Sequence, residues 1–162
     1  MNDNLLIREA RPDDMRAILA FQQAAIAAVD PRVYTDAERR AWARTPAVGM
    51  AQIVADGRYL VADASGRLAG GAGWDTLPDP PDAAVVRAVF VDPAWHGRGL
   101  GATLVRAVEA AIAAAGRRRI LVPAALNAVG FYERLGYAAN EIGIVDLDGV
   151  DLRYRRMWKS AA

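Results

Sequence analysis

The clearest hydrophobic pattern in the chain is a short apolar run that changes, across a glycine-rich turn, into a helical repeat. The run AVVRAVFV at residues 84–91 is almost entirely apolar and rich in β-branched residues, which is typical of a strand buried on both faces. From Leu100 to Ile112 apolar residues recur every three to four positions, and Gly116 follows as a helix stop signal. The pattern therefore predicts a central strand, a turn and a long helix.

Similar patterns predict the remaining elements in order along the chain. Strands are expected at Leu5–Glu9, Tyr59–Ala64, Arg67–Trp74, Arg119–Ala124, Tyr137–Leu147 and Val150–Trp158. Helices are expected from Pro12 to about Val29, from Asp36 towards Arg44, at Val48–Ala55, and at Ala128–Leu135 with Asn127 as the N-cap. Antiparallel hairpins are expected at the turn dipeptides Ser65-Gly66 and Asp148-Gly149, and a capping box at Thr35 and Glu38.

The strand at 119–124 follows the long helix, and a helical crossover makes it parallel to the strand at 84–91. Pro123 removes a main-chain donor inside this strand, so two interpretations stay open. Either this strand has no neighbour on one side at Pro123, or the sheet ends at Val122.

The turn His96-Gly97-Arg98-Gly99-Leu100-Gly101 joins the central strand to the long helix. Its glycines allow successive N–H groups to converge on an anion beside the positive end of the helix dipole, which predicts a diphosphate site. A Rossmann dinucleotide site requires glycines directly after the strand and an acidic residue about 20 positions later, and the chain has neither. A Walker P-loop is excluded because no GK[ST] sequence occurs.

The sequence Val91-Asp92-Pro93 followed by HGRGLG (96–101) resembles motif A of the GCN5-related N-acetyltransferase (GNAT) family, whose pattern is (Q/R)xxGx(G/A). His96 stands where that family usually has Gln or Arg. The run AVGFYERLGY (128–137) resembles motif B, although Ala125 stands where many members have Asn. The resemblance implies an α/β GNAT fold with one domain over residues 1–162. Helices would flank a mixed, mostly antiparallel sheet whose central parallel strands splay apart.

The resemblance also implies acetyl-CoA as cosubstrate and N-acetyltransferase activity towards a primary amine of a small molecule or peptide, by direct attack through a tetrahedral intermediate. The cofactor-binding residues that it implies are Phe90, Val91, His96, Gly97, Arg98, Gly99, Leu100, Gly101, Ala102, Thr103 and Asn127. Main-chain N–H groups near Phe90 and Val91 are expected to hold the thioester oxygen where the strand bulges. Tyr132 is expected to protonate the leaving thiolate, and the competing interpretation is that it only packs with Phe131.

No general base is evident, because Val85 stands where many relatives have Glu and the guanidinium of Arg87 stays charged. The amine proton is expected to leave through ordered water to Asp75 or another carboxylate. His96 is a weaker candidate, since its motif position implies a place beside the phosphates.

The acceptor pocket is expected between the first two helices and the acidic loop at 75–83. Its candidate aromatic walls are Tyr34, Trp42 and Trp74, and its candidate ammonium-binding acids are Asp30, Asp36, Asp75, Asp79 and Asp82. The basic run at 117–119 is expected to interact with the helix C-terminus or to reach the 3′-phosphate of the coenzyme.

Composition narrows the function classes. Twenty basic and nineteen acidic residues give a net charge of +1, which argues against nucleic acid or an anionic membrane as the main partner. The chain has no Cys and one His, so disulfides, thiol nucleophiles and multi-histidine sites are excluded, and no metal is expected. The absence of a signal-peptide pattern and of a long apolar run favours the cytoplasm.

Two other function classes stay open at this point. A non-catalytic acyl-CoA sensor is favoured by the missing glutamate, and a nucleotide-binding module of another fold is disfavoured by the glycine spacing. A homodimer is compatible with the sequence, which does not specify an assembly.

Overall fold

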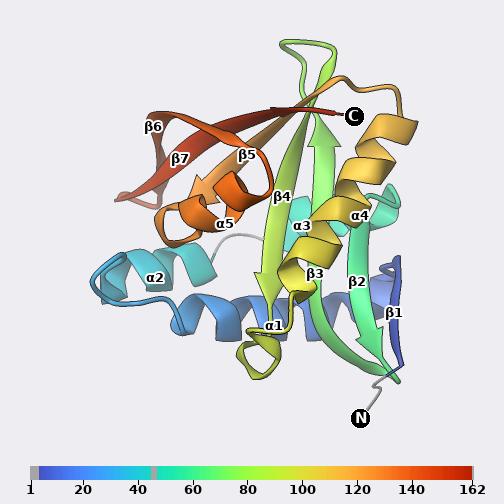
Figure 1. Cartoon of the computed structure of the whole chain (residues 1–162). Coiled ribbons are helices and arrows are strands. Elements are labelled where there is room, and N and C mark those ends of the chain that lie inside the picture. The colour runs from blue at the N-terminus through green and yellow to red at the C-terminus, as the bar shows by residue number, and fades with distance from the viewer. Residues whose placement is uncertain (1–3, 45–46, 162) are drawn as a thin grey trace.

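Strand β4 (Ala83–Val91) lies at the centre of a seven-stranded mixed sheet, with strand order β1-β2-β3-β4-β5-β7-β6 (Figure 1). The computed structural model describes residues 4–44 and 47–161. The other strands are β1 (Leu5–Glu9), β2 (Tyr59–Ala64), β3 (Arg67–Thr76), β5 (Arg119–Ala125), β6 (Ala138–Leu147) and β7 (Val150–Ser160). The helices are α1 (Met15–Ala27), α2 (Asp36–Ala43), α3 (Ala47–Ala55), α4 (Leu100–Ala114) and α5 (Val129–Arg134), with short 3₁₀ turns η1 (Pro12–Asp14), η2 (Pro93–Trp95) and η3 (Leu126–Ala128).

The predicted elements are all present, and the differences lie at their ends. The capping box of α2 is confirmed, since Thr35 Oγ1 accepts from the N–H of Glu38 and the Glu38 carboxylate accepts from the N–H of Thr35. Helix α1 ends two residues before Val29. The prediction that Asn127 caps α5 is wrong, because Asn127 lies inside η3 and the helix begins two residues later without a side-chain cap.

The parallel pair β4–β5 separates after only three paired positions, Ala83–Val85 against residues 119–121. Strand β5 continues beside β7 as far as Ala125, so the interpretation that the sheet ends at Val122 is wrong. The N–H of Ala161 donates to the carbonyl of Arg118 on the β7 side, so alternation turns the nitrogen of Pro123 towards β4. Pro123 therefore lies where its strand has no neighbour on that side, and it costs no ladder hydrogen bond.

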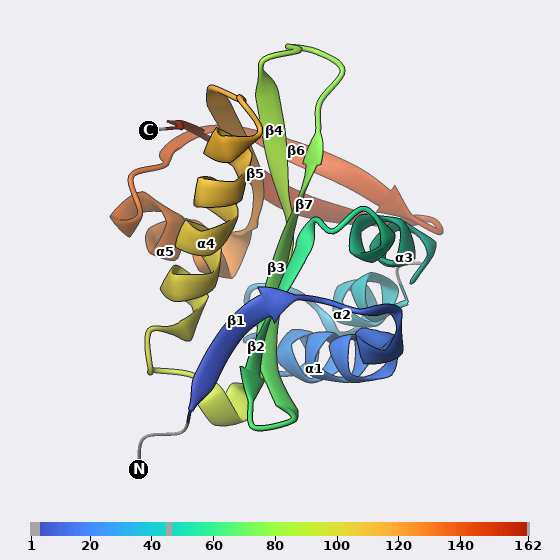
Figure 2. The same ribbon diagram turned by 90° about the vertical axis from the view of Figure 1, so that its right-hand side faces the viewer.

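Helices cover both faces of the sheet (Figure 2). Helix α4 buries the predicted apolar stripe, including Leu104, Val108 and Ile112, against one face. Helices α1 and α3 cover the other face, where Ile18 and Phe21 pack with the strands. Each such side chain contributes about 1.5–3 kcal/mol on burial, so the two clusters fix the sheet between the helical layers.

No helix in the described residues combines the length and the apolar character that crossing a bilayer requires.

Candidate active site

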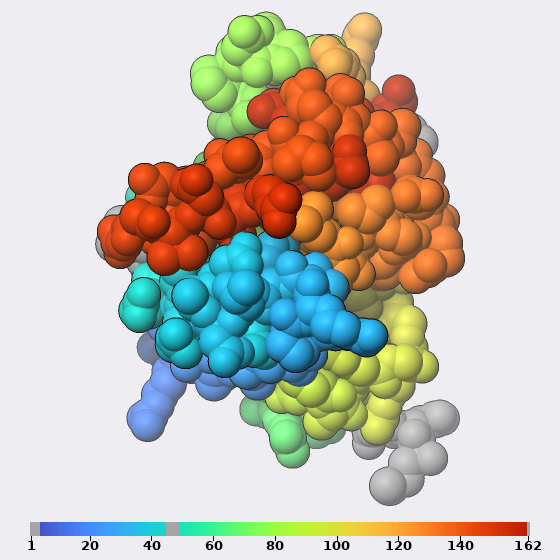
Figure 3. Space-filling view, turned by 90° about the vertical axis from the view of Figure 1, so that its left-hand side faces the viewer, coloured from blue at the N-terminus to red at the C-terminus, as the bar shows by residue number. Residues whose placement is uncertain are grey.

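A cavity of about 1110 Å³ lies where β4 and β5 separate. Its wall comes from the second half of β4, the turn before α4, the η3–α5 segment, and the helices α1 to α3. Figure 3 shows these regions meeting on one face: α1–α2 in blue and cyan, the β5–α5 region in orange, and the turn before α4 in yellow. Residues far apart in the sequence thus share one cavity.

Strand β4 bulges beside this cavity. Phe90 pairs with Gly71 and Arg87 with Gly73, so β4 carries one extra residue relative to β3. Within the bulge Ala88 has a φ of +53°, a conformation that side chains other than glycine rarely adopt. The bulge therefore changes the direction of the main chain at the point where β4 has lost its β5 neighbour.

The register determines which main-chain groups of β4 face the opening. The N–H of Asp92 donates to the carbonyl of Ala69 on β3 over 2.9 Å. Because successive groups of a strand alternate in direction, the N–H and carbonyl of Val91 point away from β3, and those of Phe90 point towards it. Of the two predicted donors, only Val91 turns its N–H to the opening.

Tyr59 supports the bulge from the α1 side of the sheet. Its hydroxyl donates to the carbonyl of Ala88 over 2.9 Å, and the side chain is fully buried. The ring lies against Gly71 and Gly73, where an added Cβ would approach it to 2.6 Å. Two glycines on β3 therefore make room for the aromatic ring that holds the strained residue.

The glycine-rich turn adopts the geometry that the sequence predicts. Gly97 and Gly99 have φ of +78° and +75°, and Gly99 is the N-cap of α4. The first N–H groups of α4, on Leu100, Gly101 and Ala102, have no intrahelical acceptor and find no other among the described residues. These free donors stand at the positive end of the helix dipole, an arrangement that suits an anion.

The side chains of this turn mostly bind the protein itself. His96 Nε2 donates to the carbonyl of Val91 over 3.0 Å, which links the turn to the end of β4. Thr103 Oγ1 donates to the carbonyl of Gly99 over 3.2 Å, and the Arg98 guanidinium lies 4.6 Å from the centre of the Trp95 ring. What the turn leaves available is therefore chiefly its main chain.

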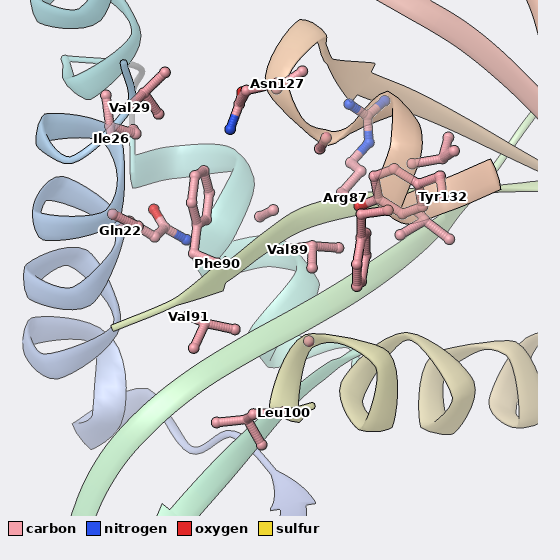
Figure 4. A pocket seen from close by; sticks show the side chains of 18 of the residues that line it. Gln22, Ile26, Val29, Arg87, Val89, Phe90, Val91, Leu100, Asn127 and Tyr132 are labelled. Carbon is pink, nitrogen blue, oxygen red and sulfur yellow. The ribbon is translucent and has the colours of Figure 1, made fainter. Parts of the chain in front are cut away.

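Tyr132 projects into the cavity from α5 (Figure 4). Its ring packs edge-on against Phe131 and Tyr137, with centroids 4.9 and 5.6 Å apart, and the side chain is 5% exposed. Its hydroxyl makes no hydrogen bond within the described part of the chain, and burial raises the pKa of the phenol. A protonated donor therefore faces the cavity without a partner among the residues that the structure describes. The packing interpretation holds for the ring, while the hydroxyl stays available.

Two aromatic residues connect the α1–α2 region to this centre. Trp42 lines the cavity and contacts both Tyr34 and Phe90, each at 5.7 Å between centroids. Tyr34 is buried, donates to the carbonyl of Arg153 over 2.5 Å and accepts from the N–H of Leu126 over 2.9 Å. The loop between α1 and α2 is thus tied to β7 and to η3.

A family model for the acetyltransferase (GNAT) family matches residues 14–137. The chain belongs to the GNAT acetyltransferase family. An uncharacterized N-acetyltransferase of Methanocaldococcus jannaschii is 28% identical over 144 residues, which are 84% of this chain and 62% of that protein.

Solved GNAT structures share the fold. The crystal structure of a GCN5-related N-acetyltransferase from Rhodopseudomonas palustris matches with a TM-score of 0.80 and 29% identity, over 96% of this chain and 94% of the other. The PaiA N-acetyltransferase of Thermoplasma acidophilum, solved with coenzyme A, has a TM-score of 0.73 at 18% identity, over 96% and 98% of the two chains. A Brucella melitensis GNAT protein, solved with acetyl-CoA, has a TM-score of 0.67 at 22% identity, over 99% and 90%.

Within this GNAT fold the predicted acceptor residues do not all reach the cavity. Tyr34 lies behind Trp42, and Trp74 is buried in the cluster under α4, with the Arg58 guanidinium 4.9 Å from its ring centre. Trp74 faces α4 because side chains alternate along β3, and the neighbouring Asp75 takes the other face. Of the three predicted aromatic walls, only Trp42 lines the cavity.

The predicted ammonium-binding acids are mostly paired or remote. Asp75 alone lines the cavity, and Arg58 donates to its Oδ1 over 3.0 Å. Asp30 is held by Arg32 and Asp36 by Arg39. Asp79 and Asp82 lie in the β3–β4 connection outside the cavity wall. Of the five candidate acids, Asp75 is therefore the one that the structure brings to the cavity.

The arginine run at 117–119 follows the C-terminal end of α4, where the main-chain N–H of Arg117 donates to the carbonyl of Ile112 over 3.2 Å. Arg117 donates to the carbonyl of Pro81, and Arg119 stacks on Trp158 at 4.6 Å. The 15 residues of α4 span about 22 Å and separate the run from the glycine turn. None of the three lines the cavity, which contradicts their use for the 3′-phosphate.

The polar cavity residues that were not assigned a binding role from the sequence include Gln22, Gln23, Arg87 and Arg134. Gln22 lines the cavity from α1, and Arg87 lines it from β4 (Figure 4). The sequence does contain an indication for Arg87, because it is the one charged residue in the apolar run 84–91. A charged side chain inside such a strand indicates a position that does not pack into the hydrophobic core.

Proposed function

We propose that this GNAT protein is an N-acetyltransferase that transfers an acetyl group from acetyl-CoA to a primary amine of a small molecule or peptide. The observation that carries the proposal is one cavity that holds a bulged β4, the outward N–H of Val91, and the unpartnered Tyr132 hydroxyl. The coenzyme A and acetyl-CoA complexes of the T. acidophilum and B. melitensis proteins support the choice of cosubstrate.

The residues present fit an acyl-CoA. The free N–H groups at residues 100–102 and the glycines of the turn would hold the diphosphate. The opening between β4 and β5 would admit the pantetheine arm, and the Asn127 amide, which points into the cavity, would supply a polar contact there (Figure 4). His96 would act by bracing the turn against Val91.

Acetyl-CoA supplies the acetyl group as a thioester. In direct attack the amine nitrogen bonds to the carbonyl carbon, the carbon–sulfur bond breaks, and the amine loses a proton. The N–H of Val91 would donate to the carbonyl oxygen as it gains negative charge. Tyr132 would give its proton to the leaving thiolate, since burial keeps its phenol protonated.

The amine proton would leave through water to Asp75. This carboxylate lines the cavity, and Arg58 and the N–H of Thr76 both donate to its Oδ1, which leaves Oδ2 to accept. His96 is not proposed as the base, because it belongs to the turn that would hold the diphosphate and its Nε2 braces that turn against Val91.

Calorimetry and a thiol-release assay together test the proposal. Acetyl-CoA is expected to bind without added metal and in preference to NAD or ATP, and free thiol is expected only when an amine is present. Failure of acetyl-CoA to bind, or binding with no thiol release across a broad amine library, would contradict it.

A second candidate, a non-catalytic acyl-CoA sensor, is favoured by Val85. This residue stands where many relatives have Glu, and it is 2% exposed and cannot accept a proton. The same assay separates the two, because a sensor binds acetyl-CoA and releases no thiol with any amine.

A further inference from the structure

The cavity wall is mostly apolar, and the acidic and basic side chains in it include Asp75, Arg87 and Arg134. Arg87 leaves β4 immediately before the bulge residue Ala88, and its side chain extends into the cavity (Figure 4). The preceding Val86 packs under α4, so alternation sends Arg87 to the opposite face, where Phe90 also packs. Apolar side chains from α1, from the residue Val29 that follows it and from α3 also line the cavity: Leu19, Ile26, Val29, Met50 and Ile53.

Arg87 has no ion pair and no hydrogen bond with any residue in the described ranges. Asp75 lies on the same face of the sheet, and its pairing partner Val85 lies two positions before Arg87 on β4. That carboxylate is already neutralised by Arg58 at 3.0 Å. A guanidinium with five N–H donors is therefore presented to the cavity, and no acceptor for it lies in the described part of the chain.

We propose that Arg87 binds the carboxylate of the acceptor, and that the acceptor is an amino acid with an apolar side chain. The inference rests on the proposed acetyl transfer. A guanidinium binds a carboxylate through two parallel hydrogen bonds, and the position beside the bulge keeps the bound carboxylate close to the reacting centre. The apolar wall would take the side chain, and a second ammonium group would be repelled by Arg87.

Thiol release measured on matched amines tests this assignment. Leucine carries the carboxylate, leucinamide replaces it with a neutral amide, 3-methylbutylamine lacks it, and spermidine adds cationic groups. With the wild-type protein, kcat/KM for leucine is expected to exceed that for leucinamide by about 10- to 100-fold, the worth of a hydrogen-bonded charge pair. Spermidine is expected to be the poorest acceptor.

Variants then locate the effect. R87Q is expected to lower kcat/KM for leucine by about 10- to 100-fold and to leave leucinamide within about 2-fold, while R87K keeps part of the preference. R16Q is the matched control, because Arg16 is exposed on α1 and outside the cavity wall, and it is expected to change neither value. Acetyl-CoA affinity of R87Q, measured by calorimetry, is expected to equal that of the wild type.

Each alternative outcome contradicts a different statement. Three results would overturn the carboxylate assignment and leave acetyl transfer standing. The wild type would use leucine and leucinamide equally, or it would prefer spermidine, or R87Q would lose the same activity on all amines. Loss of acetyl-CoA affinity in R87Q would assign Arg87 to the coenzyme and also overturn it. No thiol from any amine would overturn the proposed function itself.

Discussion

The two sides of the cavity are built from different parts of the polypeptide. The side formed by the turn before α4 and the end of β4 offers main-chain N–H groups, at Val91 and at residues 100–102. The side formed by α1, α2, α3 and the middle of β4 offers side chains, among them Trp42 on α2 and Arg87 on β4. Tyr132 stands in the cavity wall, and its hydroxyl has no hydrogen-bond partner among residues 4–44 and 47–161.

This difference explains why one side is readable from a motif and the other is not. A main-chain site requires only particular backbone φ angles and a suitably directed helix N-terminus, so glycines at fixed positions reveal it in the sequence. Because its donors are main-chain N–H groups, such a site can have His96 where Gln or Arg is usual. A side-chain site depends on which residues of distant elements face one another. The first side would determine that acyl-CoA binds, and the second would determine which amine is accepted.

The largest expected effect is at Tyr132, because the proposed proton donor is a side chain that no main-chain group replaces. Tyr132→Phe is expected to lower kcat by about 10²–10⁴-fold. Acetyl-CoA affinity by calorimetry and the unfolding temperature are the controls, and both should stay close to wild type. An unchanged kcat would remove the tyrosine from the mechanism.

The next effect concerns the support of the bulge from the α1 side. Gly73→Ala places a Cβ 2.6 Å from the Tyr59 ring and 3.0 Å from the Arg58 carbonyl, and is expected to destabilise the fold by about 1–3 kcal/mol. Gly49→Ala, in α3, meets no atom within 4 Å and is expected to stabilise by about 0.5–1 kcal/mol. Chemical denaturation measures both. Similar free energies of unfolding for the two variants would mean that the Tyr59 ring is not held against β3.

Gly99, in the turn before α4, tests the effect of a positive φ alone, because a side chain added there would meet no neighbouring atom. Gly99→Ala meets no atom within 4 Å, yet its φ of +75° makes the substitution cost about 1–2 kcal/mol. Because Gly99 caps α4, acetyl-CoA affinity is expected to fall about 5- to 10-fold. Gly66→Ala, at φ +94° in the β2–β3 turn, is expected to lose similar stability and no affinity. Equal affinities in the two variants would place the anion elsewhere.

Alkaline pH tests the burial of Tyr132 separately from its chemistry. Burial in the folded protein raises the pKa of the Tyr132 phenol above its unfolded-state pKa, which is near 10. The stability that the buried, protonated phenol contributes is therefore complete below about pH 10 and is lost as the pH rises further. From pH 9 to pH 11 the wild type is expected to lose about 1 kcal/mol more stability than Tyr132→Phe. Parallel denaturation curves at the two pH values measure this, and identical losses would show an exposed phenol.

The smallest expected effect is at His96, whose role in the turn is a single hydrogen bond to the Val91 carbonyl. His96→Gln keeps an N–H donor and is expected to change acetyl-CoA affinity by less than about 3-fold. His96→Ala removes the donor and is expected to weaken binding about 5-fold. A large loss in His96→Gln would mean that the main-chain side needs this particular side chain.

The amino-acid sequence alone was sufficient for features whose cause is local in the chain. The strand–turn–helix at 84–114 follows from apolar periodicity and from glycines at positive φ, and the α2 capping box follows from Thr35 and Glu38. Local rules failed at Asn127, where the chain forms a 3₁₀ turn before α5 begins.

Only the tertiary structure decided which side chains meet in the cavity. Residues 17 positions apart neutralise each other in the Arg58–Asp75 pair, and residues 119 positions apart join in the Tyr34–Arg153 hydrogen bond. The same packing leaves Arg87 without a described partner and sends Trp74 to the α4 face. Periodicity and turn chemistry act between neighbours in sequence, whereas charge pairing and strand register act between residues that folding alone brings together.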